Sequence, residues 1–158
     1  MNFYSKYFST LNKKILTYDK LALNLLVKSL KEVKKNKKKV IIVGNGGSAA
    51  MASHVCVDLT KACNIRSVNF NEADLLTCFA NDYGYENWVK KAVDFYADKK
   101  DLFICISSSG MSKNIIIGAK QAKKLGCNVV TLSGFSKSNK LKKEGHINFW
   151  VDSSNYNI

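Results

Sequence analysis

The chain has 158 residues, of which 46% are hydrophobic and 23% charged. This balance is typical of one folded domain with one core and excludes a disordered chain. No apolar run approaches the ~18 residues of a membrane-spanning helix, and residues 1–10 lack the apolar stretch of a signal peptide. The composition therefore predicts a cytoplasmic protein that does not bind a membrane.

The net charge of +13 comes almost entirely from lysine, because Arg66 is the only arginine. Proline is absent and asparagine is abundant, which indicates a compositional drift of a whole proteome rather than selection for a polyanion. A module that reads DNA sequence favours arginine, which pairs with guanine through two hydrogen bonds. We therefore expect no nucleic-acid partner; an anionic small substrate fits the sign of the charge equally well.

The five cysteines form no CxxC pair, and their number is odd. They stand at positions 56, 63, 78, 105 and 127. Several fall within apolar runs, so we expect reduced, buried cysteines of the kind found in cytosolic proteins.

Hydrophobic periodicity divides the chain into alternating helices and strands. Leucines at three- and four-residue spacing predict a helix over 17–36, the main part of an N-terminal helical segment at 1–36. Unbroken β-branched runs such as 39–43 are typical of strands that are buried on both faces. The expected helices further along are 49–63, 74–80, 86–97 and 113–125, and the expected strands are 39–43, 65–70, 101–106, 127–132 and 146–151.

Strand, small-residue loop and helix alternate three times along the chain. This pattern predicts an α/β fold, with a parallel sheet covered by helices on both faces. The sequence contains no long internal repeat and no linker, so we expect a single domain over 1–158.

Small polar residues follow three of the predicted strands, in the loops 44–48, 107–112 and 131–136. Ligands of open α/β sheets bind beyond the carboxyl ends of the strands, and two of these loops open into helices, whose first amides attract anions. The second loop holds four hydroxyl groups, whereas a helix cap needs one. The sequence therefore predicts a cradle for a phosphate monoester. Its hydroxyls belong to Ser107, Ser108, Ser109 and Ser112.

The first loop also satisfies the loose dinucleotide pattern GxGxxA, from Gly44 to Ala49. That pattern expects an acidic residue about 20 positions further on, but no acid occurs there before Glu72. We therefore expect no nucleotide cofactor.

His54 and Asp58 lie four residues apart on one predicted helix, so they share one face. Such a pair can transfer protons, bind a metal ion or form a local hydrogen bond. The pattern alone leaves these alternatives open, and only the glycine loop upstream favours a functional role.

Four segments together resemble the SIS family of sugar isomerases, in particular its bacterial phosphoheptose isomerases, from about residue 17 to the end. They are GNGGSAAMASH followed by a carboxylate, FANDYGYENW, SSSGMSKN and VVTLSG. The resemblance implies a three-layer αβα sandwich of flavodoxin-like type, with a five-stranded parallel sheet, an N-terminal helix and assembly into a homotetramer. It also implies a reaction: an aldose–ketose conversion of sedoheptulose 7-phosphate to D-glycero-D-manno-heptose 7-phosphate through an enediol, for capsule or lipopolysaccharide synthesis.

The resemblance assigns roles position by position. Asn45 and Gly46 fall on the loop that faces the sugar, and Asp82 falls on an aspartate that contacts substrate. His54 falls on a zinc ligand in those members that bind zinc, and Asp58 on a glutamate that is both ligand and proton-transfer base. The family's phosphate-binding serines correspond to Ser48, Ser107, Ser108, Ser109 and Ser112.

Two departures from the family matter. Asp58 is one methylene shorter than glutamate, although a base must come within ~3 Å of its proton. The family's final helix, with a glutamine ligand and a second acid/base histidine, would follow Ile158; we expect that this sequence lacks that segment, and His146 is a poor substitute. Two alternatives stay open: a non-catalytic, regulatory SIS module that binds a sugar phosphate or a partner protein, and a zinc-free isomerase of another phosphosugar.

Overall fold

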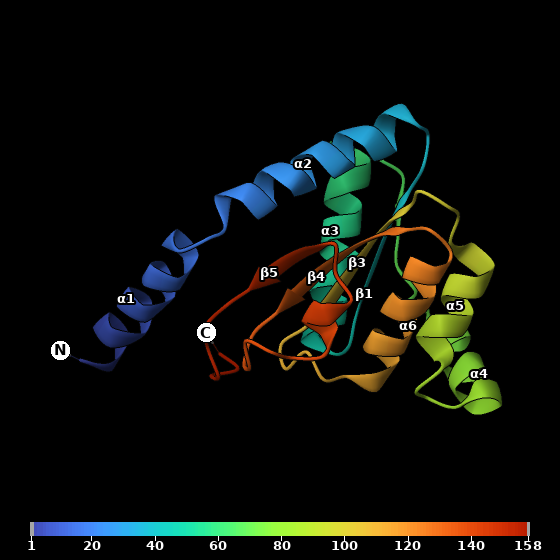
Figure 1. Cartoon of the computed structure of the whole chain (residues 1–158). Coiled ribbons are helices and arrows are strands. Elements are labelled where there is room, and N and C mark those ends of the chain that lie inside the picture. Colours follow the sequence, from blue (N-terminus) through green and yellow to red (C-terminus); the bar gives the residue numbers. More distant parts are fainter. Residues whose placement is uncertain (1, 158) are drawn as a thin grey trace.

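The computed structural model describes residues 2–157, and helices and strands alternate along most of this range (Figure 1). Met1 and Ile158, which bound the expected domain, lie outside the described residues. The elements are α1 (Phe3–Leu16), α2 (Lys20–Lys35), β1 (Val40–Gly44), α3 (Gly47–Lys61), β2 (Ser67–Val68), α4 (Ala73–Tyr83), α5 (Trp88–Tyr96), β3 (Leu102–Ser107), α6 (Lys113–Lys124), β4 (Asn128–Ser133), the 3-10 turn η1 (Leu141–Lys143) and β5 (Ile147–Trp150).

The strands form one five-stranded sheet in the order β2-β1-β3-β4-β5, and every pair is parallel. Gly44 pairs with Ile106, and Ser107 pairs with Ser133, so the carboxyl ends of β1, β3 and β4 lie at one edge. This topology confirms the predicted five-stranded parallel sheet of flavodoxin-like type.

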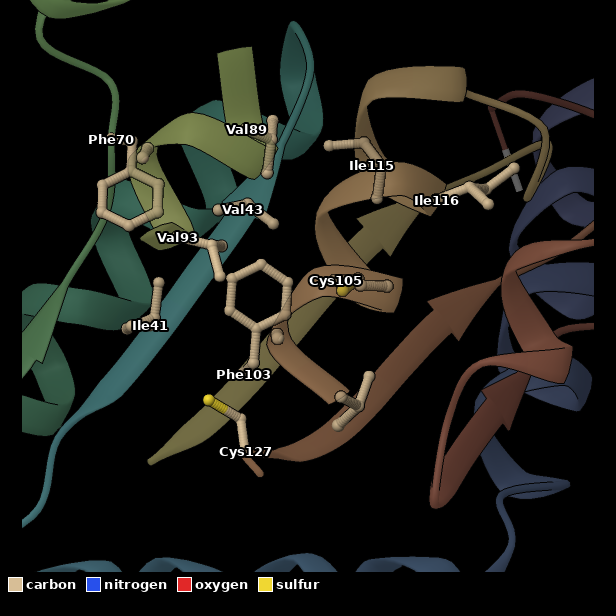
Figure 2. Close-up of a cluster of buried hydrophobic side chains, with 14 of the residues drawn as sticks. Ile41, Val43, Phe70, Val89, Val93, Phe103, Cys105, Ile115, Ile116 and Cys127 are labelled. Carbon is tan, nitrogen blue, oxygen red and sulfur yellow. The ribbon is translucent and has the colours of Figure 1, made fainter. Parts of the chain in front are cut away.

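Helices cover both faces of the sheet, as predicted for a three-layer sandwich. Alternate residues of β1 and β3 point to opposite faces, and residues 40–43 and 102–103 are at most 1% exposed. On one face, Ile41, Val43 and Phe103 pack against α5 and α6 (Figure 2). On the other face, Ile42 and Ile104 pack against α2 and α3.

The chain reverses its direction across the sheet between β1 and β3. After β1 it passes through α3 to the outer strand β2, and then returns beyond β1 to form β3. Consequently α3 leaves β1 on one face and α6 leaves β3 on the other. This topological switch point leaves a crevice at the carboxyl ends of two neighbouring strands, where ligands of such sheets bind.

Several element boundaries differ from the predictions. α2 begins at Lys20 rather than 17, because the Asp19 carboxylate accepts the backbone N–H of Ala22 at 2.9 Å and caps the helix. β2 contains two residues rather than six. α4 continues to Tyr83 rather than ending at 80, since the first backbone conformation that stops it is Gly84 with φ 81°. Asp82 consequently lies on a helix and not in a loop.

The N-terminal segment is divided into α1 and α2. α1 has no buried side chain and projects away from the sheet (Figure 1). It touches the end of the described chain where the Tyr7 hydroxyl donates to the carbonyl of Asn157 at 2.9 Å. No helix within residues 2–157 is both long enough and apolar enough to cross a membrane.

All five cysteines have free thiols, but only three are buried. Cys56, Cys105 and Cys127 pack in the core, and burial raises the pKa of Cys127 to about 11. The prediction of burial is wrong for Cys63 and Cys78, which are exposed. Cys63 lies just beyond α3, and Cys78 lies on α4, which has no buried residue.

Candidate functional site

Three loops meet at the carboxyl edge of the sheet, and residues of the first two line a small cavity of about 60 Å³. The first follows β1, the second follows β3, and the third follows β4 and is joined to the second where the N–H of Gly134 donates to the carbonyl of Ser108 at 2.8 Å. The sequence-predicted serines therefore converge on one place. The residues that line this cavity, called the cradle below, are Asn45, Ser48, Ile106, Ser107, Ser108, Ser109, Ser112 and Tyr156.

The first wall of the cradle depends on a close approach between β1 and α3. A Cβ atom on Gly44 would lie 2.6 Å from the Cβ of Ser48, so only glycine allows this contact. Gly46, the N-cap residue of α3, has φ 54° and offers no side-chain cap. The N–H groups of Ser48 and Ala49 donate to the carbonyls of Asn45 and Gly46 at 3.0 and 2.9 Å, so within the described chain the N–H of Gly47 is the first-turn amide left free to receive an anion.

The second wall is the serine loop between β3 and α6. The hydroxyls of Ser107 and Ser112 lie 3.1 Å apart, and the Ser109 hydroxyl accepts the N–H of Met111 at 3.2 Å. Ser112 is the N-cap of α6, yet its side chain makes no capping bond. Neither α3 nor α6 has an acidic residue in its first turn. Two uncapped helix N-termini therefore give the cradle a positive potential.

Asn139 holds the third loop in place, and sequence reasoning missed it. Its side chain is buried, and its amide donates to the hydroxyl of Ser133 at 3.0 Å and to the carbonyl of Ser136 at 2.9 Å. Its carbonyl oxygen accepts the N–H of Lys142 at 2.9 Å. A lone asparagine in a lysine-rich stretch carries no signal that would have predicted this role.

Asn114 and Tyr85 are two further residues that sequence reasoning did not single out. The side-chain amides of Asn114 and Asn45 exchange two hydrogen bonds, of 3.0 and 2.9 Å. The Tyr85 hydroxyl reaches Asn45 Oδ1 at 3.5 Å. The only sequence signal for them was their membership of the SSSGMSKN and FANDYGYENW segments.

A larger cavity of about 310 Å³ adjoins the cradle, with which it shares Ile106, Ser108 and Tyr156. Its walls come from α3, the ends of β3, β4 and β5, and the segment after β5. A phosphate in the cradle would thus have room beside it for the rest of a small molecule. The other lining residues are Met51, Leu132, Ser133, Gly134, Phe135, Phe149, Val151, Ser153 and Asn155.

His54 and Asp58 lie on the outer face of α3. The Nε2 atom of His54 is 3.5 Å from Oδ2 of Asp58, and the two side chains are 80% and 62% exposed. Met51, almost one turn before His54, lines the larger cavity. Among residues 2–157, the pair lines neither cavity. The structure thus brings the two side chains together, beside the cavities rather than within them.

Asp82 is exposed in the last turn of α4, where it accepts the side-chain amide of Asn81 at 2.9 Å. Its carboxylate lies 3.6 Å from the Cys78 sulfur and raises the pKa of that thiol. Asp82 lines neither cavity within the described chain. Tyr85, three residues later, reaches the cradle residue Asn45, since its hydroxyl lies 3.5 Å from Oδ1 of that residue.

The described residues fit a zinc site only in part. Nowhere among residues 2–157 do three or more His, Cys, Asp or Glu side chains gather as a metal would require. His54 and Asp58 supply two donors, whereas catalytic zinc takes three protein ligands. The chemistry proposed below is therefore derived from the side chains alone.

Comparisons with known proteins agree on one family. The model of the SIS domain matches residues 3–134. The phosphoheptose isomerase of Helicobacter pylori (strain P12) is 36% identical over 121 residues, which cover 73% of this chain and 61% of the relative. The chain spans about three fifths of the length of the curated relatives that it matches.

Solved structures agree in fold. A phosphoheptose isomerase from Francisella tularensis superposes with a TM-score of 0.84 at 23% identity, over 99% of this chain and 89% of that one. Phosphoheptose isomerase GmhA from Neisseria gonorrhoeae gives 0.71 at 25% identity, over 94% and 84%.

Proposed function

Because the chain belongs to the SIS domain family, we propose that it is an aldose–ketose isomerase that converts sedoheptulose 7-phosphate into D-glycero-D-manno-heptose 7-phosphate. The similarity to phosphoheptose isomerases supports this choice of sugar. The observation that carries the proposal is the cradle, where serine hydroxyls and two uncapped helix N-termini converge. The product would feed the heptose of a surface polysaccharide.

The cradle anchors the phosphate monoester of the substrate. Hydroxyls of the serine loop donate to its oxygens, and the amides at the starts of α3 and α6 face its charge. The first turns of both helices are free of acidic residues, so nothing local repels the dianion. This anchor directs the open-chain sugar along the larger cavity towards the outer face of α3.

Asp58 is the proposed base for the reacting carbons. It removes a proton from C1 of the ketose; the C1–H electrons form the C1=C2 double bond, and the C2 carbonyl oxygen takes up a proton, which gives an enediol. The O1 hydroxyl then loses its proton as the C1 carbonyl forms, and C2 receives a proton. His54, 3.5 Å from the carboxylate, is the neighbouring group that can exchange protons with these oxygens.

We also propose that the chain works as a cytoplasmic homo-oligomer, a tetramer, with residues 1–158 as one SIS domain. The exposed His54–Asp58 pair is flanked by exposed apolar side chains of α3, namely Met51, Val55 and Val57. A second copy on this face would exclude water from the pair, which proton transfer at carbon requires.

Proton NMR in deuterated buffer tests the proposal directly. The protein is incubated with sedoheptulose 7-phosphate, and aldose signals with solvent deuterium at C2 are the expected result. A variant with Ser109→Ala and Ser112→Ala serves as the comparison and loses both conversion and binding. Retained binding in that variant would remove the cradle from the proposal.

A second candidate is a non-catalytic module that binds a sugar phosphate. Within the described residues, neither His54 nor Asp58 lines either cavity, and this favours the second candidate. Binding without conversion and without exchange at C1 would select this candidate. If the protein converts only another phosphosugar, the proposed reaction type stands and the proposed substrate is wrong.

A further inference from the structure

A reciprocal amide pair connects the two walls of the cradle. Nδ2 of Asn45 donates to Oδ1 of Asn114 at 3.0 Å, and Nδ2 of Asn114 donates back to Oδ1 of Asn45 at 2.9 Å. Asn45 follows β1, whereas Asn114 lies in the first turn of α6 and is 3% exposed. The pair therefore joins segments 69 residues apart in the sequence, across the switch point of the sheet.

Counting donors and acceptors shows what remains of the Asn45 amide. An amide oxygen has two lone pairs, and the nitrogen carries two hydrogens. Asn114 takes one lone pair and one hydrogen, and the Tyr85 hydroxyl lies at 3.5 Å on the oxygen side. Within residues 2–157, the second N–H of Asn45 has no partner, and Asn45 lines the cradle.

We propose that Asn114 is a positioning residue, which turns the Asn45 amide so that its free N–H, and not its oxygen, faces the bound phosphate ester. This inference rests on the proposed function, because it assumes a phosphate in the cradle. An amide turned the other way would present its oxygen to phosphate oxygens, and two acceptors repel each other. Asn114 suits the task because its own side chain is buried, and the Tyr85 hydroxyl, 3.5 Å from Oδ1 of Asn45, determines which side of the paired amide carries the oxygen.

The chemistry explains why an amide is needed at position 114. A serine there is too short to exchange two bonds with Asn45, and an aspartate can accept from Asn45 but cannot donate when ionised. Loss of the pair leaves the Asn45 side chain free to rotate. Ligand binding must then fix this side chain, and the entropy cost of doing so weakens the affinity. Asn114 itself makes no contact with the ligand in this proposal.

A double-mutant cycle on Asn45 and Asn114 tests the inference. Titrations with inorganic phosphate and with sedoheptulose 7-phosphate are expected to show about tenfold weaker binding for Asn114→Ala, equivalent to one hydrogen bond to a charged group. Since Asn114 acts through Asn45, the double variant should bind within about twofold of Asn45→Ala alone. In turnover, KM should rise more than kcat falls, because the anchor contributes equally to the ground and transition states.

Asn128→Ala is the matched control. The Asn128 side-chain amide also donates a hydrogen bond between elements, to the Ser29 hydroxyl at 3.0 Å, but Asn128 lies at the other end of β4. It should lower the melting temperature comparably and leave phosphate binding unchanged. Additive losses in the cycle, or unchanged binding by Asn114→Ala, would overturn the positioning role while leaving the proposed function intact. A wild-type protein that binds neither ligand would overturn the proposed function and this role with it.

The amide pair can also be observed without any ligand. In ¹⁵N spectra of the free protein, one side-chain proton of Asn45 and one of Asn114 should exchange slowly with solvent. Addition of inorganic phosphate should shift the other proton of Asn45 and leave the free proton of Asn114 in place. Rapid exchange of all four protons in the wild-type protein would contradict the pair itself.

Discussion

At the scale of single residues, Asp58 combines a demanding proposed task with an unusual position. Its side chain is 62% exposed and touches His54 at 3.5 Å. Its arm is one methylene shorter than that of the glutamate that the family resemblance implies. A misplacement of about 1 Å can cost a hundredfold in rate, so the proposed activity would depend on how α3 positions the carboxylate.

Replacing Asp58 with asparagine separates catalysis from binding. We expect Asp58→Asn to lower kcat by at least about a hundredfold, the usual contribution of a general base, with sugar-phosphate binding unchanged because Asp58 does not line the cradle. Steady-state kinetics and calorimetric titration measure the two effects. Asp94→Asn, which removes the ion pair with Lys90 and alters the hydrogen bond from Gln121, both away from the cradle and from α3, is the control. A fully active Asp58→Asn enzyme would end the assignment.

His146 makes stability depend on pH. Partial burial and the charge of Lys123 lower its pKa below 6.5, and its Nδ1 accepts the N–H of Val129 at 2.9 Å, which requires an unprotonated nitrogen. The unfolded chain therefore binds a proton more readily than the folded one. The stabilisation is complete above pH 6.5 and decreases as the pH falls below it.

Urea unfolding at pH 7.5 and 5.5 checks this dependence. We expect the wild type to be slightly less stable at the lower pH because of this group, and the effect should be small because the side chain is mostly exposed and screened. His146→Gln should remove that part of the loss, whereas His54→Gln should retain it. Equal losses in the wild type and in His146→Gln would contradict the assignment.

At the scale of elements, the corner between β1 and α3 decides whether the cradle forms. Gly44 lets the strand end approach Ser48, and the N–H of Ser48 donates to the carbonyl of Asn45 at 3.0 Å. The same corner leaves the N-terminus of α3 without a side-chain cap. Stability and anion binding are therefore coupled at this corner.

Substitution of Gly44 and Gly47, which lie three residues apart, tests whether the close packing of β1 against α3 contributes to stability. Gly44→Ala should lower the free energy of unfolding by about 1–3 kcal/mol, because its Cβ would overlap Ser48. Gly47→Ala should be neutral or slightly stabilising, since nothing lies within 4 Å of its Cβ and alanine favours helix. Denaturant unfolding of both variants measures the difference. Equal stabilities would show that β1 and α3 can separate without cost.

At the scale of the whole molecule, the N-terminal segment formed by α1 and α2 exposes several large apolar side chains. Phe3, Tyr4 and Phe8 on α1 are 62–75% exposed, and Leu21 on α2 is 69% exposed. Several large exposed apolar side chains on one helix are typical of protein–protein contacts. This exposure supports the proposed homo-oligomer independently of the α3 face.

Light scattering coupled to size exclusion tests that assembly. The wild-type chain should elute as a multiple of its 17.6 kDa mass, and the combined change Tyr4→Lys and Phe8→Lys should shift it towards the monomer. Lys6→Gln, on the same helix, should leave the mass unchanged. A wild-type protein that is monomeric at micromolar concentration would contradict the oligomer.

Much of the architecture was determined by the sequence alone, because its signals are local. The β-branched run at 39–43 predicted a strand buried on both faces, and residues 40–43 are indeed buried. The four serines between 107 and 112, at the end of β3 and after it, predicted a common cradle, and the structure brings them to one cavity. Helix caps and periodicity involve neighbours within a few residues, so they can be read without the fold.

Other features were decided only by the tertiary structure. The Asn45–Asn114 pair spans 69 residues, and the buried Asn139 is one of many asparagines, so neither could be selected from local pattern. His54 and Asp58 were correctly expected to share a helix face, but their exposure beside the cavities depends on how α3 packs on the sheet. The physical reason is that hydrogen bonding and burial between distant segments depend on the order of the strands and the orientation of the helices, which no short stretch of sequence contains.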